Sequence, residues 1–86
     1  MPTLSVFYGI VIFMHWNDHP PPHFHAVYGE YEATFTIYPI ALDRGSLPAR
    51  ARTHVFEWAA HYQQELEEAW ERSRRHEDPG RIDPLV

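Results

Sequence analysis

Residues 23–37 are predicted to form a β-hairpin whose register follows from the sequence. Gly29-Glu30 suits a two-residue type II′ turn, which prefers glycine first, between strands at 23–28 and 31–37. In this register one face collects Phe24, Ala26, Tyr28, Tyr31, Ala33 and Phe35, and the other collects His23, His25, Val27, Glu32, Thr34 and Thr36. A slip by one residue would mix the two sets, so the segregation predicts an antiparallel sheet with the first face against the core.

The rest of the chain completes an α+β pattern. Two strands are expected at about residues 4–8 and 10–16, with Gly9 as a bulge or tight turn between them. Residues 43–48 are typical of a loop, and from about 47 to 75 apolar residues recur at helical spacing without an intervening glycine, the only proline being Pro48 at the start. We expect an antiparallel β-meander of about four strands, with one long C-terminal helix packed on its apolar face. The domain should span residues 1–76, and residues 77–86 should be a C-terminal tail.

The expected helix is longer than the sheet that it covers. A helix of roughly 27 residues spans about 40 Å, whereas a seven-residue strand spans about 23 Å. An overhanging end would expose Tyr62, Leu66 and Trp70, and we expect them to be a docking surface for a second copy of the chain or for a partner protein. The alternative is a bend, or a break near Gln63-Gln64 that folds the second half back. No glycine or proline marks such a break, which favours the overhang.

Composition and charge narrow the classes of function. The chain has 86 residues, enough for one domain, and a formal net charge of −5. Residues 1–43 contain no lysine or arginine, so this half lacks the fixed positive charge that binding to a nucleic-acid backbone needs, and would instead attract a cation. There is no cysteine, which rules out disulfides and thiolate metal sites and makes the cytoplasm the expected location. The apolar run at residues 10–14 is too short to cross a bilayer.

Histidines near a triple proline are the first candidate for chemistry. His23 and His25 are two residues apart, so on a strand both imidazoles project from one face and can bind one metal ion. Asp18, His19 and Glu32 are the candidates for a further ligand. The sequence therefore favours a divalent metal, zinc first, on the exposed face of the sheet. The alternative is that the two histidines only form hydrogen bonds with neighbouring threonines.

Two other functions remain open from the residues alone. His23 and His25 could act as an acid–base pair in a metal-independent ribonuclease, with Arg50, or its neighbours Arg44 and Arg52, stabilising the developing negative charge. The chain could equally be a non-catalytic protein-interaction module. Whether it is an enzyme is left open by these alternatives.

Several short motifs together resemble one family. They are Phe7-Tyr8-Gly9-Ile10, Asn17-Asp18-His19, the segment from Pro21 to Glu30 with the pattern PPHFHA-x-YGE, and Gly45-Ser46-Leu47-Pro48. Over nearly its whole length the chain resembles a small prokaryotic domain of unknown function, catalogued as number four-one-six-zero. The resemblance implies a component of a two-protein, toxin–antitoxin-like module with a small neighbour-encoded partner. It supplies no catalytic residues.

Overall fold

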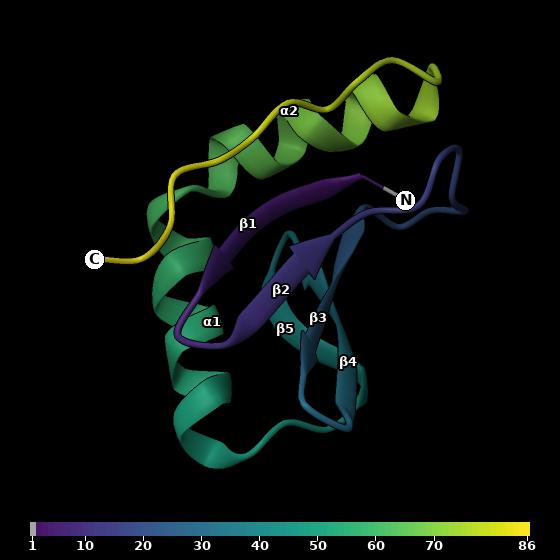
Figure 1. Cartoon of the computed structure of the whole chain (residues 1–86). Helices are drawn as coiled ribbons and strands as arrows, with labels where there is room; N and C mark the ends of the chain where they lie inside the picture. The colour runs from purple at the N-terminus through teal and green to yellow at the C-terminus, as the bar shows by residue number, and fades with distance from the viewer. Residues whose placement is uncertain (1) are drawn as a thin grey trace.

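One antiparallel sheet covered by two helices makes up the computed structural model, which describes residues 2–86 (Figure 1). The sheet contains β1 (Thr3–Phe7), β2 (Ile10–Phe13), β3 (His23–Tyr28), β4 (Tyr31–Ile37) and β5 (Ile40–Gly45), in chain order and each antiparallel to its neighbour. Helices α1 (Ala49–His61) and α2 (Gln63–Arg74) follow. The α+β class is confirmed, with five strands in place of about four and two helices in place of one.

The β3–β4 hairpin has the predicted register. Tyr28 pairs with Tyr31, and Phe24 pairs with Phe35. Gly29 has a φ of +58°, as the first central residue of a type II′ turn requires. The rings of Phe24 and Phe35 stack with centroids 5.4 Å apart and both are fully buried under the helices, so the apolar face of the hairpin is the core face.

The first hairpin also forms, but β2 is shorter than expected. Tyr8 and Gly9 have φ values of +50° and +78°, the combination of a type I′ turn. The predicted strand at residues 10–16 ends at Phe13, which pairs with His25. Beyond it the chain leaves the sheet, and the backbone N–H of Asn17 donates to the carbonyl oxygen of Ser73 at 3.0 Å. Residues 14–22 consequently form a loop at one end of the sheet.

Strand β5 occupies part of the segment expected to be a loop. Thr34 pairs with Arg44 and Phe35 pairs with Leu42, so Asp43 is an extra residue that forms a β-bulge. The strand lies at the edge of the sheet, and its last four residues are exposed. Its charged residues and Gly45 resemble loop residues for this reason.

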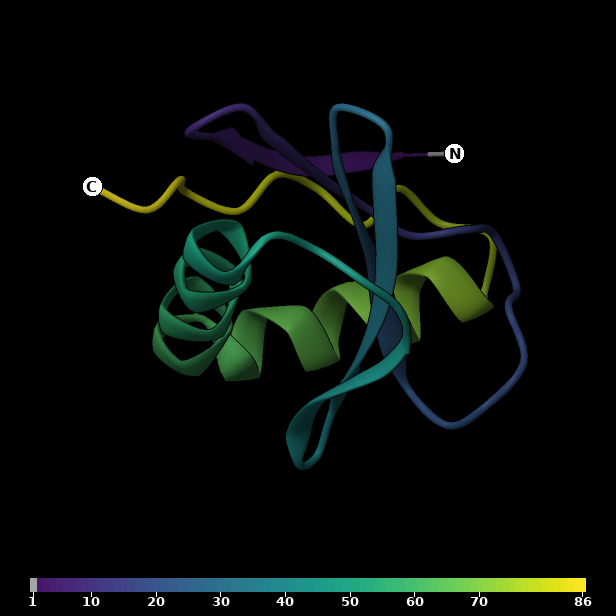
Figure 2. The ribbon, with the colours of Figure 1, turned by 90° about the horizontal axis from the view of Figure 1, so that it is seen from below.

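The helical segment is divided at Tyr62, whose φ and ψ are −115° and 28°, and α1 and α2 cross at a steep angle (Figure 2). A straight helix of about 40 Å would exceed the longest dimension of the molecule, 33 Å. The turn instead lays α2 across the sheet, and Leu66 and Trp70 are 0% and 2% exposed in the core. The prediction that Leu66 and Trp70 form a docking surface is wrong, because other parts of the chain cover both side chains. Tyr62 is half-buried at the turn.

The last ten residues pack against the domain. The backbone N–H of Ile82 donates to the carbonyl oxygen of Leu4 at 2.8 Å. The indole N–H of Trp58 donates to the backbone carbonyl oxygen of Asp83 at 2.8 Å. Ile82 belongs to the hydrophobic core. This segment therefore covers the β1 edge of the sheet, although it has no regular secondary structure.

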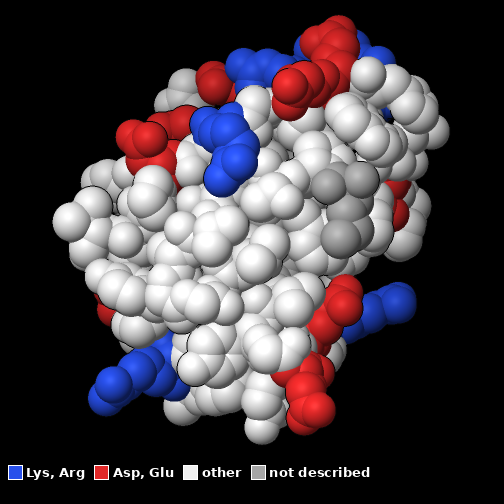
Figure 3. Space-filling view, in the orientation of Figure 1, with Lys and Arg blue, Asp and Glu red and all other residues white. Residues whose placement is uncertain are grey.

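Three exposed tyrosines lie at the end of the sheet that is away from residues 14–22. Tyr8, Tyr28 and Tyr31 are 55%, 38% and 49% exposed. Tyr8 lies in the turn of the first hairpin, and Tyr28 and Tyr31 flank the turn of the second. Seen from the side of β1 and β2, charged side chains lie over α2 and at the opposite end, with a broad uncharged area between them (Figure 3).

Candidate functional site

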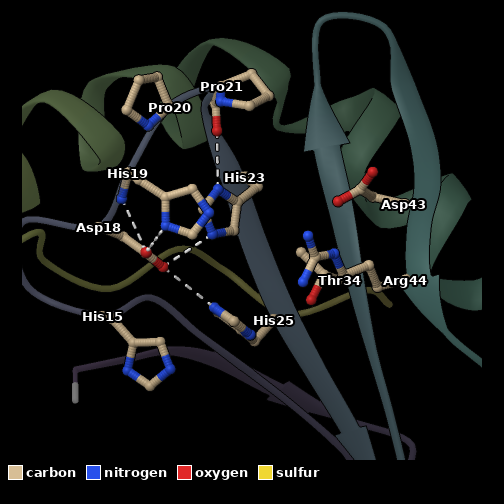
Figure 4. Close-up of a pocket in the computed structure, with 10 residues that line it drawn as sticks. All are labelled: His15, Asp18, His19, Pro20, Pro21, His23, His25, Thr34, Asp43 and Arg44. Carbon is tan, nitrogen blue, oxygen red and sulfur yellow. Dashed lines mark hydrogen bonds and ion pairs between the residues drawn. The ribbon is translucent and has the colours of Figure 1, made fainter.

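A cavity of about 460 Å³ lies at the end of the sheet where β2 ends and β3 begins. One wall comes from the loop at residues 14–22, the floor from β3 and β4, and the opposite wall from β5 (Figure 4). The residues that line it are His15, Asp18, His19, Pro20, Pro21, His23, His25, Thr34, Asp43 and Arg44. The volume is in the range of small-molecule sites.

His23 has an oxygen acceptor at each ring nitrogen. Nδ1 lies 2.8 Å from the carbonyl oxygen of Pro21, and Nε2 lies 2.8 Å from Oδ2 of Asp18. Neither oxygen can donate when Asp18 is ionised, so the ring must donate from both nitrogens, or a metal cation must take the place of the Nε2 proton. The imidazole is held in place by Trp70 of α2, whose ring centroid is 5.1 Å away. His23 is only 7% exposed, whereas it was expected to lie on an exposed face of the sheet.

Asp18 connects the histidines. Its Oδ1 accepts a hydrogen bond from the backbone N–H of His19 at 2.8 Å, and its Oδ2 faces Nε2 of both His23 and His25. Burial alone would raise the pKa of Asp18, but the hydrogen bonds from His19, His23 and His25 outweigh it, so that the pKa lies below its ordinary value. The carboxylate is therefore the ionised form near neutral pH.

His25 is the second imidazole of the group. Its Nε2 lies 3.5 Å from Oδ2 of Asp18, and its ring stacks on Phe13 with centroids 4.9 Å apart. Burial lowers the pKa of His25; the hydrogen bond from its ring to Asp18 opposes this, and the nearby His15 and His23 lower the pKa further. The neutral ring that results is the form that binds metals.

These three side chains form a compact set of possible metal ligands. One ligand atom each from Asp18, His23 and His25 lies within 4.8 Å of the others. Two imidazoles and a carboxylate are the ligands found in catalytic zinc sites and in non-haem iron sites. Of the residues proposed from the sequence, the structure therefore brings together the histidine pair and Asp18.

The other residues proposed from the sequence lie outside this three-ligand set. His19 is 77% exposed in its side chain, and its Nδ1 contacts Oδ1 of Asp18 at 2.9 Å, outside the three-ligand set. Glu32 approaches the other nitrogen of His25, with Oε2 3.8 Å from Nδ1, too far for a hydrogen bond. Arg50 lines a separate hollow along α1 and does not line the histidine cavity. The structure thus gives the acid–base hypothesis no support from Arg50.

Asp43 and Arg44 also line the cavity. From the sequence, Asp43 was expected in a loop, and Arg44 was named with Arg52 as an alternative to Arg50 for stabilising negative charge beside the histidine pair. Both belong to β5, and Arg44 pairs with Thr34, which pairs in turn with His25. The hairpin register already places Thr34 beside His25, so recognising β5 would have revealed the third member of this row.

Comparison with known proteins identifies a family. Residues 9–71 match the family described as a domain of unknown function, DUF4160. This range includes the three-ligand set and both residues of the β5 wall. Neither the curated proteins nor the solved structures give a match.

No helix within residues 2–86 has the length and apolar character needed to span a membrane.

Proposed function

We propose that this chain, which belongs to the DUF4160 family, binds a divalent metal ion, with zinc as the first expectation, through Asp18, His23 and His25. The observation that carries the proposal is the convergence of Asp18 Oδ2 with Nε2 of both histidines at the wall of one cavity. The site would belong to a cytoplasmic protein without cysteine ligands.

The distances from Asp18 to the two histidine nitrogens suit a tetrahedral ion. Ligand bonds of about 2.0 Å at tetrahedral angles separate neighbouring ligand atoms by roughly 3.3 Å. In the structure Oδ2 of Asp18 lies 2.8 Å from Nε2 of His23 and 3.5 Å from that of His25. These values bracket the required separation, so small rotations of the side chains would admit the ion.

The groups around the three ligands also favour the binding of a cation. The carbonyl oxygen of Pro21 accepts from Nδ1 of His23, which leaves Nε2 as the nitrogen able to bind metal and fixes the ring orientation. Nδ1 of His25 has no hydrogen-bond partner, and Oε2 of Glu32 lies 3.8 Å from it. Three protein ligands leave a coordination position for water or substrate, the arrangement of catalytic rather than structural zinc sites.

Metal content and thermal stability test the proposal. Tag-free protein incubated with Zn²⁺ and then dialysed should retain about one zinc per chain, and its melting temperature should rise with added Zn²⁺ because the ion binds only the folded chain. Asp18→Asn and His25→Ala should each abolish both effects. His61→Ala, at an exposed histidine at the end of α1, is the matched control and should behave like the wild type. Absence of retained metal in the wild type, or equal retention in all variants, would refute the proposal.

A role in a two-protein, toxin–antitoxin-like module is a second proposal, made from the resemblance to the family. Since Leu66 and Trp70 are buried, a partner or second copy would have to use another surface, and the exposed Tyr8, Tyr28 and Tyr31 support the far end of the sheet. Co-purification with the neighbour-encoded protein, reduced by Tyr31→Ala, is the expected result. Expression of the single gene without effect on growth or total RNA would exclude a toxin role, and unchanged co-purification would exclude this surface.

A further inference from the structure

We infer that the cavity takes a small phosphate-bearing molecule, with one phosphate oxygen on the metal ion and others on the guanidinium of Arg44. This inference rests on the proposed function, because the metal ion is one of the two groups that would hold the phosphate.

The β5 bulge places Arg44 in the cavity. Arg44 pairs with Thr34, and Thr34 pairs with His25, so the three residues form one row across adjacent strands and their side chains share a face. Asp43 is the extra residue of the bulge, and the bulge turns both side chains into the wall of the cavity. Gly45 then holds the strand against β4, since a Cβ there would lie 2.1 Å from the carbonyl oxygen of Glu32.

Arg44 lies in the wall of the cavity without a direct ion-pair partner among residues 2–86. Within residues 2–86 no carboxylate oxygen lies within 4.0 Å of its guanidinium nitrogens, Asp43 included. Its side chain runs from β5 toward the side of the cavity where the histidines lie (Figure 4). It is also the first lysine or arginine in the sequence, and among residues 2–86 no other lysine or arginine lines the cavity. An unpaired guanidinium opposite a metal site is suited to bind an anion held by that metal.

Charge and size indicate the class of anion. With a divalent ion bound, Asp18 and Asp43 offset part of the positive charge of the ion and Arg44, and the cavity keeps a net positive charge. A tetrahedral phosphate presents oxygens in several directions, so one can bind the metal while two face the planar guanidinium. A carboxylate has only two oxygens, so it cannot give one to the metal and two to the guanidinium. Only one arginine contributes, so the site fits one phosphate group on a small molecule and not a nucleic-acid backbone.

Cobalt-loaded protein separates this inference from the metal proposal. Co²⁺ at a site of two histidines and a carboxylate has visible absorption bands that report on metal binding, and a further ligand on the ion shifts these bands. Inorganic phosphate is titrated into the wild type, Arg44→Gln and Arg50→Gln, and acetate serves as the comparison anion. Arg50 is the matched control, since it is an arginine outside the cavity.

We expect phosphate to shift the cobalt bands saturably and acetate to bind more weakly. Arg44→Gln should bind Co²⁺ as the wild type does but bind phosphate about tenfold or more weakly, the usual effect of losing a charged hydrogen-bond partner. Arg50→Gln should match the wild type. Equal phosphate affinity in Arg44→Gln, tighter binding of acetate, or no effect of phosphate on a cobalt-bound wild type would overturn the inference. Failure of the wild type to bind Co²⁺ would instead refute the metal proposal.

Discussion

Replacing Leu66 by alanine tests whether the helical segment turns at Tyr62. Leu66 is 0% exposed and lies in the core formed by α2 and the sheet. Removing a fully buried leucine side chain costs about 3 kcal/mol, from lost burial and the cavity left behind. The higher helix propensity of alanine offsets only a few tenths of a kcal/mol of this loss. The whole domain of 86 residues is expected to have a free energy of unfolding of roughly 4–13 kcal/mol, so the variant should lose a large part of it.

Urea denaturation followed by far-UV circular dichroism measures this loss directly. We expect Leu66→Ala to lower the free energy of unfolding by about 3 kcal/mol and the melting temperature by roughly 10–20 °C. Leu42→Ala is the matched control, because Leu42 is 37% exposed on the edge strand β5, and its effect should be under about 1 kcal/mol. If α1 and α2 were one straight helix with Leu66 on its overhanging end, Leu66→Ala would change stability by less than about 0.5 kcal/mol. That result would refute the turn.

Two further predictions concern the bulge and the histidine cavity. Gly45→Ala should lower the free energy of unfolding by more than about 2 kcal/mol in urea denaturation, because the new Cβ would lie 2.1 Å from the carbonyl oxygen of Glu32. Gly80 has a similar φ and nothing within 4 Å of the Cβ position, so Gly80→Ala should lower it less. Equal losses in the two variants would refute the steric argument. Burial lowers the native pKa of His25 below 6.5, so the unfolded chain takes up this proton first as the pH falls through 6.5, and stability decreases from there down to the native pKa. His25→Gln should remove this part of the pH dependence just below pH 6.5 in metal-free protein, and an unchanged slope would contradict the assignment.

The parts of the fold that could be predicted are those fixed by local pattern. The turn at Gly29-Glu30 and the alternation on either side determine the β3–β4 register without reference to the rest of the chain. The end of α1 could not be predicted in this way, because nothing in the residues around Tyr62 forbids a continuous helix. The turn arises from packing, since it brings Leu66 and Trp70 onto the sheet. A hydrogen bond from the Gln63 side-chain amide to the carbonyl oxygen of Ile37, at 2.7 Å, joins the start of α2 to the end of β4.

Of the candidate site, the sequence could predict the histidine pair on β3 but not the ligand from the loop. His23 and His25 share a face because of strand geometry, and this alone identifies the pair. The choice of Asp18 over His19 depends on the path of the loop, where Asn17 has a φ of +49° and its backbone is held by Ser73 of α2. These are contacts between segments far apart in the sequence, which spacing cannot reveal.

Imidazole ¹⁵N NMR with Zn²⁺ tests the metal proposal most directly. The chain has seven histidines, and their ring nitrogens can be assigned individually. With one equivalent of Zn²⁺, Nε2 of His23 and His25 should shift to metal-bound values while the other five histidines keep their spectra. Shifts at His19 or His61 in place of this pair, or no change at any ring nitrogen, would contradict the account.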